Sequence, residues 1–298
     1  MDQKKNIDSL TILVLIVCCI SWGSHLVVIK MTSVDVSPLM QAGIRSIIAT
    51  IGVSLWMISR GQSIFTHDGT LWWGTYLGVF FTLEFFFIYW GLEYTNASRA
   101  VIFLYTTPFI VALGTRIFVP EEKLSSKQYL GLIIAFVGIL IAFGESLGLS
   151  SKKTLIGDGM LFLGAIFWGG TIIIVKASPL ARIAASKTLL YQLAVSAVLL
   201  PAASWILNEP GIIKITELTV LSLLYQGIWI ASITYLVWYW LILRHSAPKL
   251  SSFTFLTPIF GVVAGWILLE ESLSSQLLTS MMFVACGIYL VNKNEQNR

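Results

Sequence analysis

Charged residues are scarce in this sequence. They make up 11% of the 298 residues, whereas hydrophobic residues make up 56%. A soluble domain usually carries about 25% charged residues, so a chain of this composition cannot cover its whole surface with side chains that favour water. The scarcity excludes an ordinary soluble globular protein. It indicates an integral membrane protein, with a formal net charge of only +4.

Cysteine and histidine are also rare, with three residues of each. Cys18, Cys19 and Cys286 all lie inside apolar runs, which argues against a disulfide framework. The sequence contains no His-Glu-x-x-His and no Gly-x-Ser-x-Gly motif, so nothing supports the alternative of an integral-membrane enzyme. It contains no P-loop either, which argues against ATP as the direct energy source. We expect no enzymatic activity, cofactor, metal site or nucleic-acid partner.

Apolar stretches fill most of the chain. Each is close to the roughly 20 residues that a helix needs to cross a bilayer. Helices are expected because lipid offers the backbone no hydrogen bonds. The first stretch has no small-residue cleavage site after it, so we interpret it as a span and not as a signal peptide. The sequence predicts ten transmembrane helices, over about 10–30, 37–59, 71–92, 98–118, 128–145, 158–178, 186–206, 219–243, 248–269 and 276–292.

The second half of the chain repeats motifs of the first half in the same order. Ile-x-Trp-Gly followed by Lys occurs at 20–30 and again at 166–176. Further matches are Tyr-Trp at 89 and 239, Thr-Pro at 107 and 257, Glu-Glu-x-Leu-Ser-Ser at 121 and 270, and Gly-Ile at 138 and 287. Each half has five helices, an odd number, so the second half enters the membrane from the opposite side. The sequence therefore predicts an all-α membrane protein built from two inverted five-helix repeats, an arrangement typical of secondary transporters.

The basic residues predict the orientation. Most Lys and Arg residues at helix ends lie on the same side as the N-terminus. Lys123 and Lys127 in one loop are replaced by Ser272 and Gln276 in its counterpart, which the inversion places on the other side. Because basic residues concentrate in cytoplasmic loops, we expect both termini in the cytoplasm.

Pro108 and Pro258 occupy matched positions in the fourth and ninth predicted helices. Proline lacks the backbone N–H and clashes with the preceding turn, so both helices are expected to bend. Such bends are tolerated where neighbours or a water-filled cavity satisfy the freed carbonyls. A packing kink without function would explain one proline, whereas a symmetric pair favours helices that line a transport cavity.

With the two Trp-Gly starts, the paired Thr-Pro helices and the two Glu-Glu loops, the chain resembles the drug/metabolite transporter superfamily of the EamA type. The resemblance covers two five-helix modules, 12–143 and 157–291. It implies ten helices, cytoplasmic termini and a cavity lined mainly by helices one, three, four, six, eight and nine. It also implies transport of small metabolites, with export of amino acids prominent among members.

Three ionisable residues in the predicted membrane core occur in the first half only. His25, Arg45 and Glu84 align with Thr171, Tyr191 and Thr234. Intramembrane ionisable residues are candidates for function by default. At about 1.5 Å per residue, Arg45 and Glu84 lie at similar depth, so an ion pair between them is possible. Either the pair only stabilises the bundle, or these residues serve transport: Glu84 or His25 takes up a proton, or Arg45 binds a carboxylate.

Aromatic residues are the other candidates for a substrate wall. Tyr and Trp gather at membrane interfaces, which explains those at helix ends. Trp22 and Trp168 lie deeper and, with Tyr105, belong to helices that the resemblance places at the cavity. Such a wall suits an aromatic amino acid or an organic cation. The candidate cavity residues are Trp22, His25, Arg45, Glu84, Tyr105, Pro108, Trp168, Tyr191, Thr234 and Pro258.

These observations predict a secondary active transporter that works by alternating access in a bacterial inner membrane. We expect an exporter of amino acids or related metabolites, whose coupling to protons is left open. The alternative is an importer of a nucleotide-like or organic-cation solute. The expected partners are a small-molecule substrate and the lipid bilayer, and the sequence leaves the choice between monomer and homodimer undecided.

Overall fold

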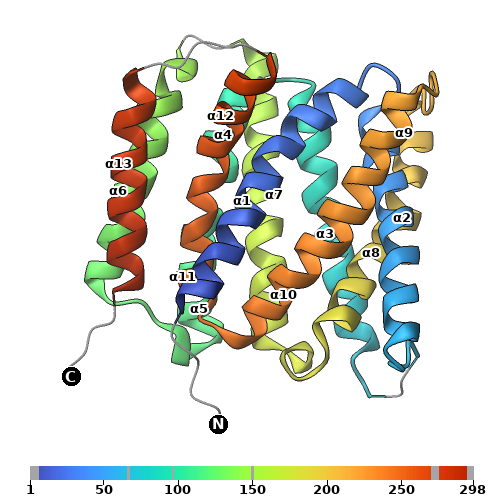
Figure 1. The fold of residues 1–298 in the computed structure, drawn as a ribbon, viewed down its shortest axis with the longest axis horizontal. Helices are drawn as coiled ribbons and strands as arrows, with labels where there is room; N and C mark the ends of the chain where they lie inside the picture. Colours follow the sequence, from blue (N-terminus) through green and yellow to red (C-terminus); the bar gives the residue numbers. More distant parts are fainter. Residues whose placement is uncertain (1–6, 66–67, 96, 149–150, 270–274, 294–298) are drawn as a thin grey trace.

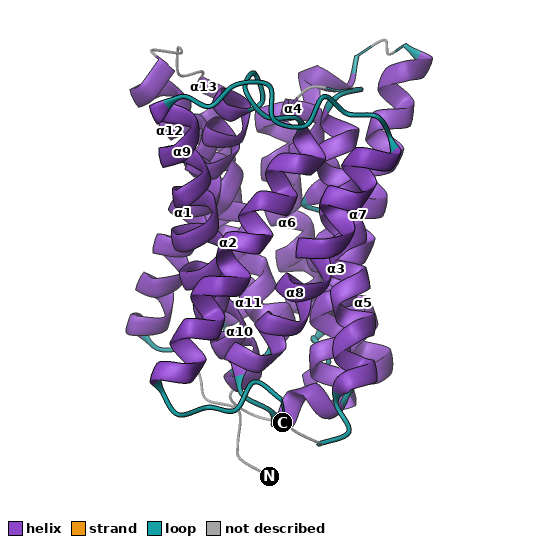
Figure 2. Ribbon diagram, turned by 90° about the vertical axis from the view of Figure 1, so that its right-hand side faces the viewer, coloured by secondary structure: helices purple, strands orange, loops and turns teal. Residues whose placement is uncertain are grey.

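A computed structural model describes residues 7–65, 68–95, 97–148, 151–269 and 275–293. Over these residues the chain forms a bundle of long helices (Figures 1 and 2). The described residues include no β-strand beyond an isolated bridge between Val36 and Ile212. The helices run between two ends of the bundle. We call the end where α1 begins and α13 finishes the terminal end, and the other the opposite end.

The first half contains α1 (Ser9–Thr32), α2 (Pro38–Ser59), α3 (Leu71–Leu92), α4 (Ala97–Leu104), α5 (Thr107–Phe118), the short η1 (Pro120–Glu122) and α6 (Ser126–Phe143). The second half contains η2 (Gly144–Leu147), α7 (Lys152–Ala177), η3 (Pro179–Arg182), α8 (Ala185–Ile206), α9 (Glu217–Leu224), the π-helix η4 (Tyr225–Thr234), α10 (Tyr235–Arg244), α11 (Ala247–Phe253), η5 (Thr254–Leu256), α12 (Thr257–Leu269) and α13 (Ser275–Asn292).

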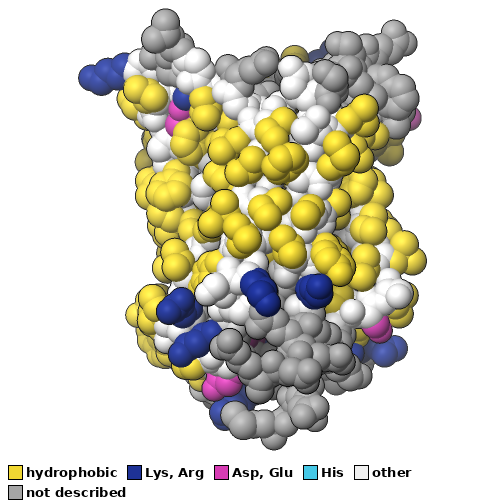
Figure 3. Space-filling model, turned by 90° about the vertical axis from the view of Figure 1, so that its left-hand side faces the viewer, with side chains coloured by type: hydrophobic (Ala, Val, Ile, Leu, Met, Phe, Trp, Pro, Cys, Tyr) yellow, Lys and Arg dark blue, Asp and Glu magenta, His cyan; other side chains and the backbone are white. Residues whose placement is uncertain are grey.

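Among the described residues, eight helical segments are long and apolar enough to cross a membrane, judged by length and composition. The stretches expected at 248–269 and 276–292 are helical as well, as α11 to α12 and as α13. Large apolar side chains cover the outside of the bundle, and Figure 3 shows them as a belt with Lys and Arg side chains gathered towards the terminal end. The prediction of an all-helical integral membrane protein is confirmed.

Polar caps set several helix ends that hydropathy places only roughly. The Ser151 side chain accepts a hydrogen bond from the Thr154 backbone, so α7 begins at Lys152 and not near residue 158. A capping box between Ser125 and Gln128 likewise starts α6 at Ser126. Such caps satisfy backbone N–H groups that have no partner within the helix.

The two matched prolines interrupt their helices, as expected, but the breaks precede them. Pro108 is the second residue of α5, which follows a break at residues 105–106. Pro258 is the second residue of α12 and follows the 3-10 turn η5. In the first turn of a helix proline lacks only a donor that would be unpaired anyway, which explains why each new helix starts beside it.

Helices of the first half pack against helices of the second half. The most extensive contacts join α6 to α13, α3 to α7, α2 to α8, α3 to α8 and α1 to α12. Glycines permit the closest approaches. A Cβ on Gly287 of α13 would lie 2.5 Å from the Gly131 carbonyl oxygen of α6. A Cβ on Gly43 of α2 would lie 2.5 Å from Pro201 Cγ, on a proline inside α8 that the sequence analysis did not consider.

Candidate functional site

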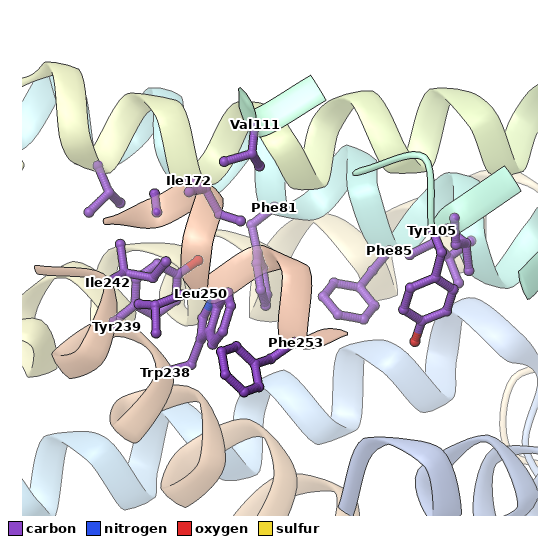
Figure 4. Close-up of a cluster of buried hydrophobic side chains, with 14 of the residues drawn as sticks. Phe81, Phe85, Tyr105, Val111, Ile172, Trp238, Tyr239, Ile242, Leu250 and Phe253 are labelled. Carbon is purple, nitrogen blue, oxygen red and sulfur yellow. The ribbon is translucent and has the colours of Figure 1, made fainter. Parts of the chain in front are cut away.

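A cavity of about 460 Å³ lies inside the bundle. Its walls come from α1, α3, α4, α7, α10 and the start of α12, which belong to the segments named by the resemblance, and also from α2. Figure 4 shows part of the aromatic packing, with Phe81 of α3 towards Trp238 of α10 and Phe85 of α3 towards Tyr105. The aromatic residues of the wall are Trp22, Phe81, Phe85, Tyr89, Tyr105, Trp168, Tyr235, Trp238 and Tyr239.

The cavity extends to the opposite end of the bundle. Its wall includes Ser33, which follows α1, and Glu93 and Thr95 between α3 and α4. A second hollow at the same end shares Ser33 and Glu93 with it and also contains Lys153. The cavity therefore reaches the surface at the opposite end, where Glu93 is exposed.

Buried charges tie four segments together at the terminal end. Lys176 Nζ, near the end of α7, lies 2.9 Å from Glu122 Oε1 of η1, with side-chain exposures of 5% and 0%. Lys176 also donates to the His245 carbonyl oxygen at 2.6 Å, and Glu122 Oε2 accepts from the Ala247 backbone N–H at 2.6 Å. We call these four residues the seal, because they join η1, α7, the residue after α10 and the start of α11 below the cavity.

Loops of the two halves also meet at the opposite end, beside the mouth. Asp35, after α1, accepts hydrogen bonds from the hydroxyls of Thr219 and Thr216 at the start of α9. These bonds, the Thr219 bond above all, hold the pKa of Asp35 below its ordinary value, and the charge of Lys214 adds to the effect. The contact fixes the α1–α2 loop against the α8–α9 loop.

Thr234 holds the wall residue Trp22 in place from behind the wall. The Trp22 indole N–H donates to the Thr234 hydroxyl at 2.9 Å, and this hydroxyl donates to the Ile230 carbonyl. The indole ring also makes edge-to-face contacts with Trp238 and Tyr235. Thr234, which the sequence analysis treated as the neutral counterpart of Glu84, thus orients a wall residue from behind.

Arg45 and Glu84 do not form an ion pair. Glu84 lines the cavity, whereas Arg45 is 0% exposed and lies behind the wall. The Arg45 Cζ atom lies 3.9 Å from the centre of the Phe85 ring. The centres of the Tyr89 and Tyr235 rings lie 6.0 Å and 5.9 Å from the same atom. The interpretation of a stabilising Arg45–Glu84 pair is therefore wrong for this structure.

The other candidates divide into those on the wall and those away from it. His25, Tyr105 and Trp168 line the cavity, and the rings of Tyr105 and Trp168 meet edge to face. Tyr191 instead packs on Gly74 and hydrogen-bonds Thr70. Pro108 and Pro258 are not among the wall residues, although their neighbours Tyr105 and Thr257 are.

Sequence reasoning missed several residues of the site. Gln41 lines the cavity, and Gln226 lies behind it on η4. Polar residues in apolar stretches were the available signal, but the analysis followed the ionisable ones only. Glu122 and Lys176 belong to the repeated motifs, which served as evidence for the duplication.

Comparisons with known proteins agree with this architecture. The model of the EamA-like transporter family matches residues 9–144 and 155–293. A probable amino-acid metabolite efflux pump of Salmonella typhimurium is 26% identical over 97% of this chain and 95% of its own length. The uncharacterized transporter YoaV of Bacillus subtilis is 23% identical over 90% of this chain and 92% of its own.

A crystal structure of a protein with 17% sequence identity has the same fold. It covers 94% of this chain and 96% of its own, with a TM-score of 0.78. The family model accounts for most of the chain, and the helices are apolar enough for a protein that crosses the membrane repeatedly. The bacterial relatives indicate the inner membrane as its place. The chain belongs to the EamA-like transporter family.

Proposed function

We propose that this protein is a secondary active transporter, and not an enzyme, that exports amino acids or related small metabolites by alternating access. The observation that carries the proposal is a cavity with an aromatic wall and a carboxyl group, open at one end of an apolar bundle and tied shut at the other. Relatives named as amino-acid metabolite efflux pumps in Salmonella typhimurium and Escherichia coli support the substrate class.

The proposed architecture is ten membrane crossings in two inverted five-helix repeats, 12–143 and 157–291, with both termini in the cytoplasm. The packing supports it. The contacts of α1 with α12 have a counterpart in those of α7 with α5, as a twofold relation between the halves requires. The Lys and Arg side chains near the terminal end support the orientation. The cavity then faces outwards in this structure.

Glu84 is the group proposed to couple transport to protons. It lies on α3, in a wall made largely of aromatic rings, where a carboxyl group can take up or release a proton as the cavity changes sides. His25 lines the same cavity and is 6% exposed. Solute export against its gradient would then use inward proton movement.

Flux measurements in proteoliposomes test this function. The protein is reconstituted, loaded with labelled L-phenylalanine or L-leucine, and given a pH gradient of either sign. We expect an inward-directed proton gradient to accelerate efflux through the wild type. The same gradient should not accelerate efflux through Glu84→Gln. Glu93→Gln, at the exposed mouth of the same cavity, should keep the pH response. Proton coupling through Glu84 fails if both variants respond to pH like wild type, and export of these amino acids fails if wild type moves neither.

A further inference from the structure

Several buried polar atoms without a hydrogen-bond partner gather around the Arg45 guanidinium. None of its three nitrogens makes a hydrogen bond with a described residue. The same holds for both amide atoms of Gln226, the Tyr89 hydroxyl and His25 Nε2. Buried polar groups are nearly always hydrogen-bonded in native proteins, because an unmade bond leaves the cost of desolvation uncompensated. Such a concentration needs an explanation.

The helices that carry these groups pack against one another. The Arg45 guanidinium lies 6.0 Å from the centre of the Tyr89 ring. Gly227, next to Gln226 on η4, packs so closely on α2 that a Cβ there would lie 3.3 Å from the Arg45 carbonyl oxygen. His25, on α1, is buried and lines the same cavity as Tyr89. A π-helix such as η4 is uncommon and is often found at functional sites.

Only the cavity wall separates this cluster from the solute path. Phe85, Tyr89 and Tyr235, the rings around the guanidinium, all line the cavity. Contact with the Phe85 ring offsets part of the cost of burying the charge. A guanidinium over an aromatic face keeps its N–H donors at its edge, where they can bind a carboxylate with two parallel hydrogen bonds.

We propose that Arg45, with the Gln226 amide and the Tyr89 hydroxyl, forms a subsite for the carboxylate of the transported solute, while Glu84 on the wall binds its ammonium group. The assignment rests on the proposed transport function and narrows its substrate to zwitterionic amino acids with an apolar side chain. Arg45 and Glu84 do not pair with each other: none of the Arg45 nitrogens has a hydrogen-bond partner among the described residues, and Glu84 lies on the cavity wall. A solute that carries both charges is complementary to two such separated groups, and the aromatic wall is complementary to its side chain.

Binding to the purified full-length protein tests the subsite with three probes: L-phenylalanine, L-phenylalaninamide, which lacks the carboxylate, and 3-phenylpropanoate, which lacks the ammonium. We expect wild type to bind L-phenylalanine at least about tenfold more tightly than either analogue, because each analogue leaves one buried charge unpaired. In Arg45→Gln, L-phenylalanine should bind only as tightly as L-phenylalaninamide, whose own affinity should not change. In Glu84→Gln, L-phenylalanine should bind only as tightly as 3-phenylpropanoate, whose own affinity should not change.

This crossed pattern is specific, since a variant that only perturbs the fold weakens all three probes together. Gln226→Leu gives a second view of the subsite, and Arg60→Gln, at the exposed end of α2, is the control for loss of an arginine. Proteoliposome flux of L-phenylalanine accompanies the titrations. If wild type transports L-phenylalanine but binds the amide as tightly, or if Arg45→Gln binds L-phenylalanine like wild type, the subsite is wrong and the transport function stands. If wild type neither binds nor transports L-phenylalanine, the proposed function is wrong for this substrate class, and the subsite fails with it.

Discussion

Removal of the Lys176 charge should open the terminal end of the bundle. In Lys176→Met the Glu122 carboxylate, 0% exposed, loses a cation 2.9 Å away. Breaking a buried ion pair by removing one partner costs about 3–5 kcal/mol, because the other charge stays buried. The cost falls on the state in which the seal is formed, and it is relieved when the end opens and water reaches Glu122. At about 1.4 kcal/mol per factor of ten, the ratio of closed to open protein should fall by roughly 100-fold or more.

A native cysteine can report this change. Cys19 of α1 is 1% exposed, and its thiol lies against the Phe253 carbonyl oxygen in α11, next to the wall at Thr257. In a background with Cys18→Ser and Cys286→Ser, a small membrane-impermeant thiol reagent is added from the terminal-end side of oriented vesicles. We expect slow labelling of the parent protein and labelling at least tenfold faster with Lys176→Met.

Two further variants separate the seal from general destabilisation. Lys176→Met with Glu122→Gln leaves no buried charge and keeps an acceptor for the Ala247 N–H, so labelling should return towards the parent rate. Lys187→Met breaks another pair at the same end, with Asp68; the Lys187 side chain is 8% exposed and that of Asp68 32%. This variant should label like the parent, because the pair is not part of the seal and the carboxylate left behind is in contact with water. The reasoning is refuted if Lys176→Met labels no faster than the parent, or if Lys187→Met labels as fast as Lys176→Met.

Two other predictions concern stability. The pKa of Asp35 is lower in the folded than in the unfolded protein, so the ionised carboxylate stabilises the fold fully above about pH 4, and this stabilisation is lost as pH falls through the folded pKa. Asp35→Asn should therefore have a lower melting temperature than wild type at pH 7. An equally large difference in melting temperature at pH 3 would contradict this. Gly287→Ala should destabilise the α6–α13 contact by about 1–3 kcal/mol, since the new methyl meets backbone atoms, whereas Gly159→Ala, with nothing within 4 Å of the new Cβ, should be neutral or slightly stabilising; equal melting temperatures of these two variants in detergent would argue against the packing.

The helices were predictable from the sequence because the bilayer fixes their length. A span needs about 20 apolar residues, and the expected stretch 71–92 coincides with α3. The observed helices differ from the predicted stretches where a polar capping residue determines the helix end. Lys152 and Lys153 are too polar for an apolar stretch, yet they form the first turn of α7 because Ser151 caps it.

The depth of the site residues in the membrane could be predicted from the sequence, but the directions in which their side chains point could not. Counting residues along a helix gives the depth of Arg45 and Glu84, and both do lie near the cavity. Pairing also depends on how each helix is rotated, and successive residues point about 100° apart. The Arg45 guanidinium meets the ring of Phe85 instead of the carboxylate of its neighbour Glu84. That rotation is set by packing between helices, such as the contact of Gly43 with Pro201, which no single helix reveals.

Repeated and unrepeated residues have different places in the structure. Glu122 and Lys176 belong to motifs present in both halves, and they join segments at an end of the bundle. His25, Arg45 and Glu84 have no ionisable counterparts, and they lie in or directly behind the cavity wall. Alternating access requires contacts at the ends to form and break in turn, a task for which a duplicated set of residues is suited. A solute with two unlike charges, by contrast, is held in one orientation only by groups that differ between the halves. The charges that break the symmetry of the sequence are therefore the ones suited to recognise the solute, and the duplicated charges are suited to change partners around it.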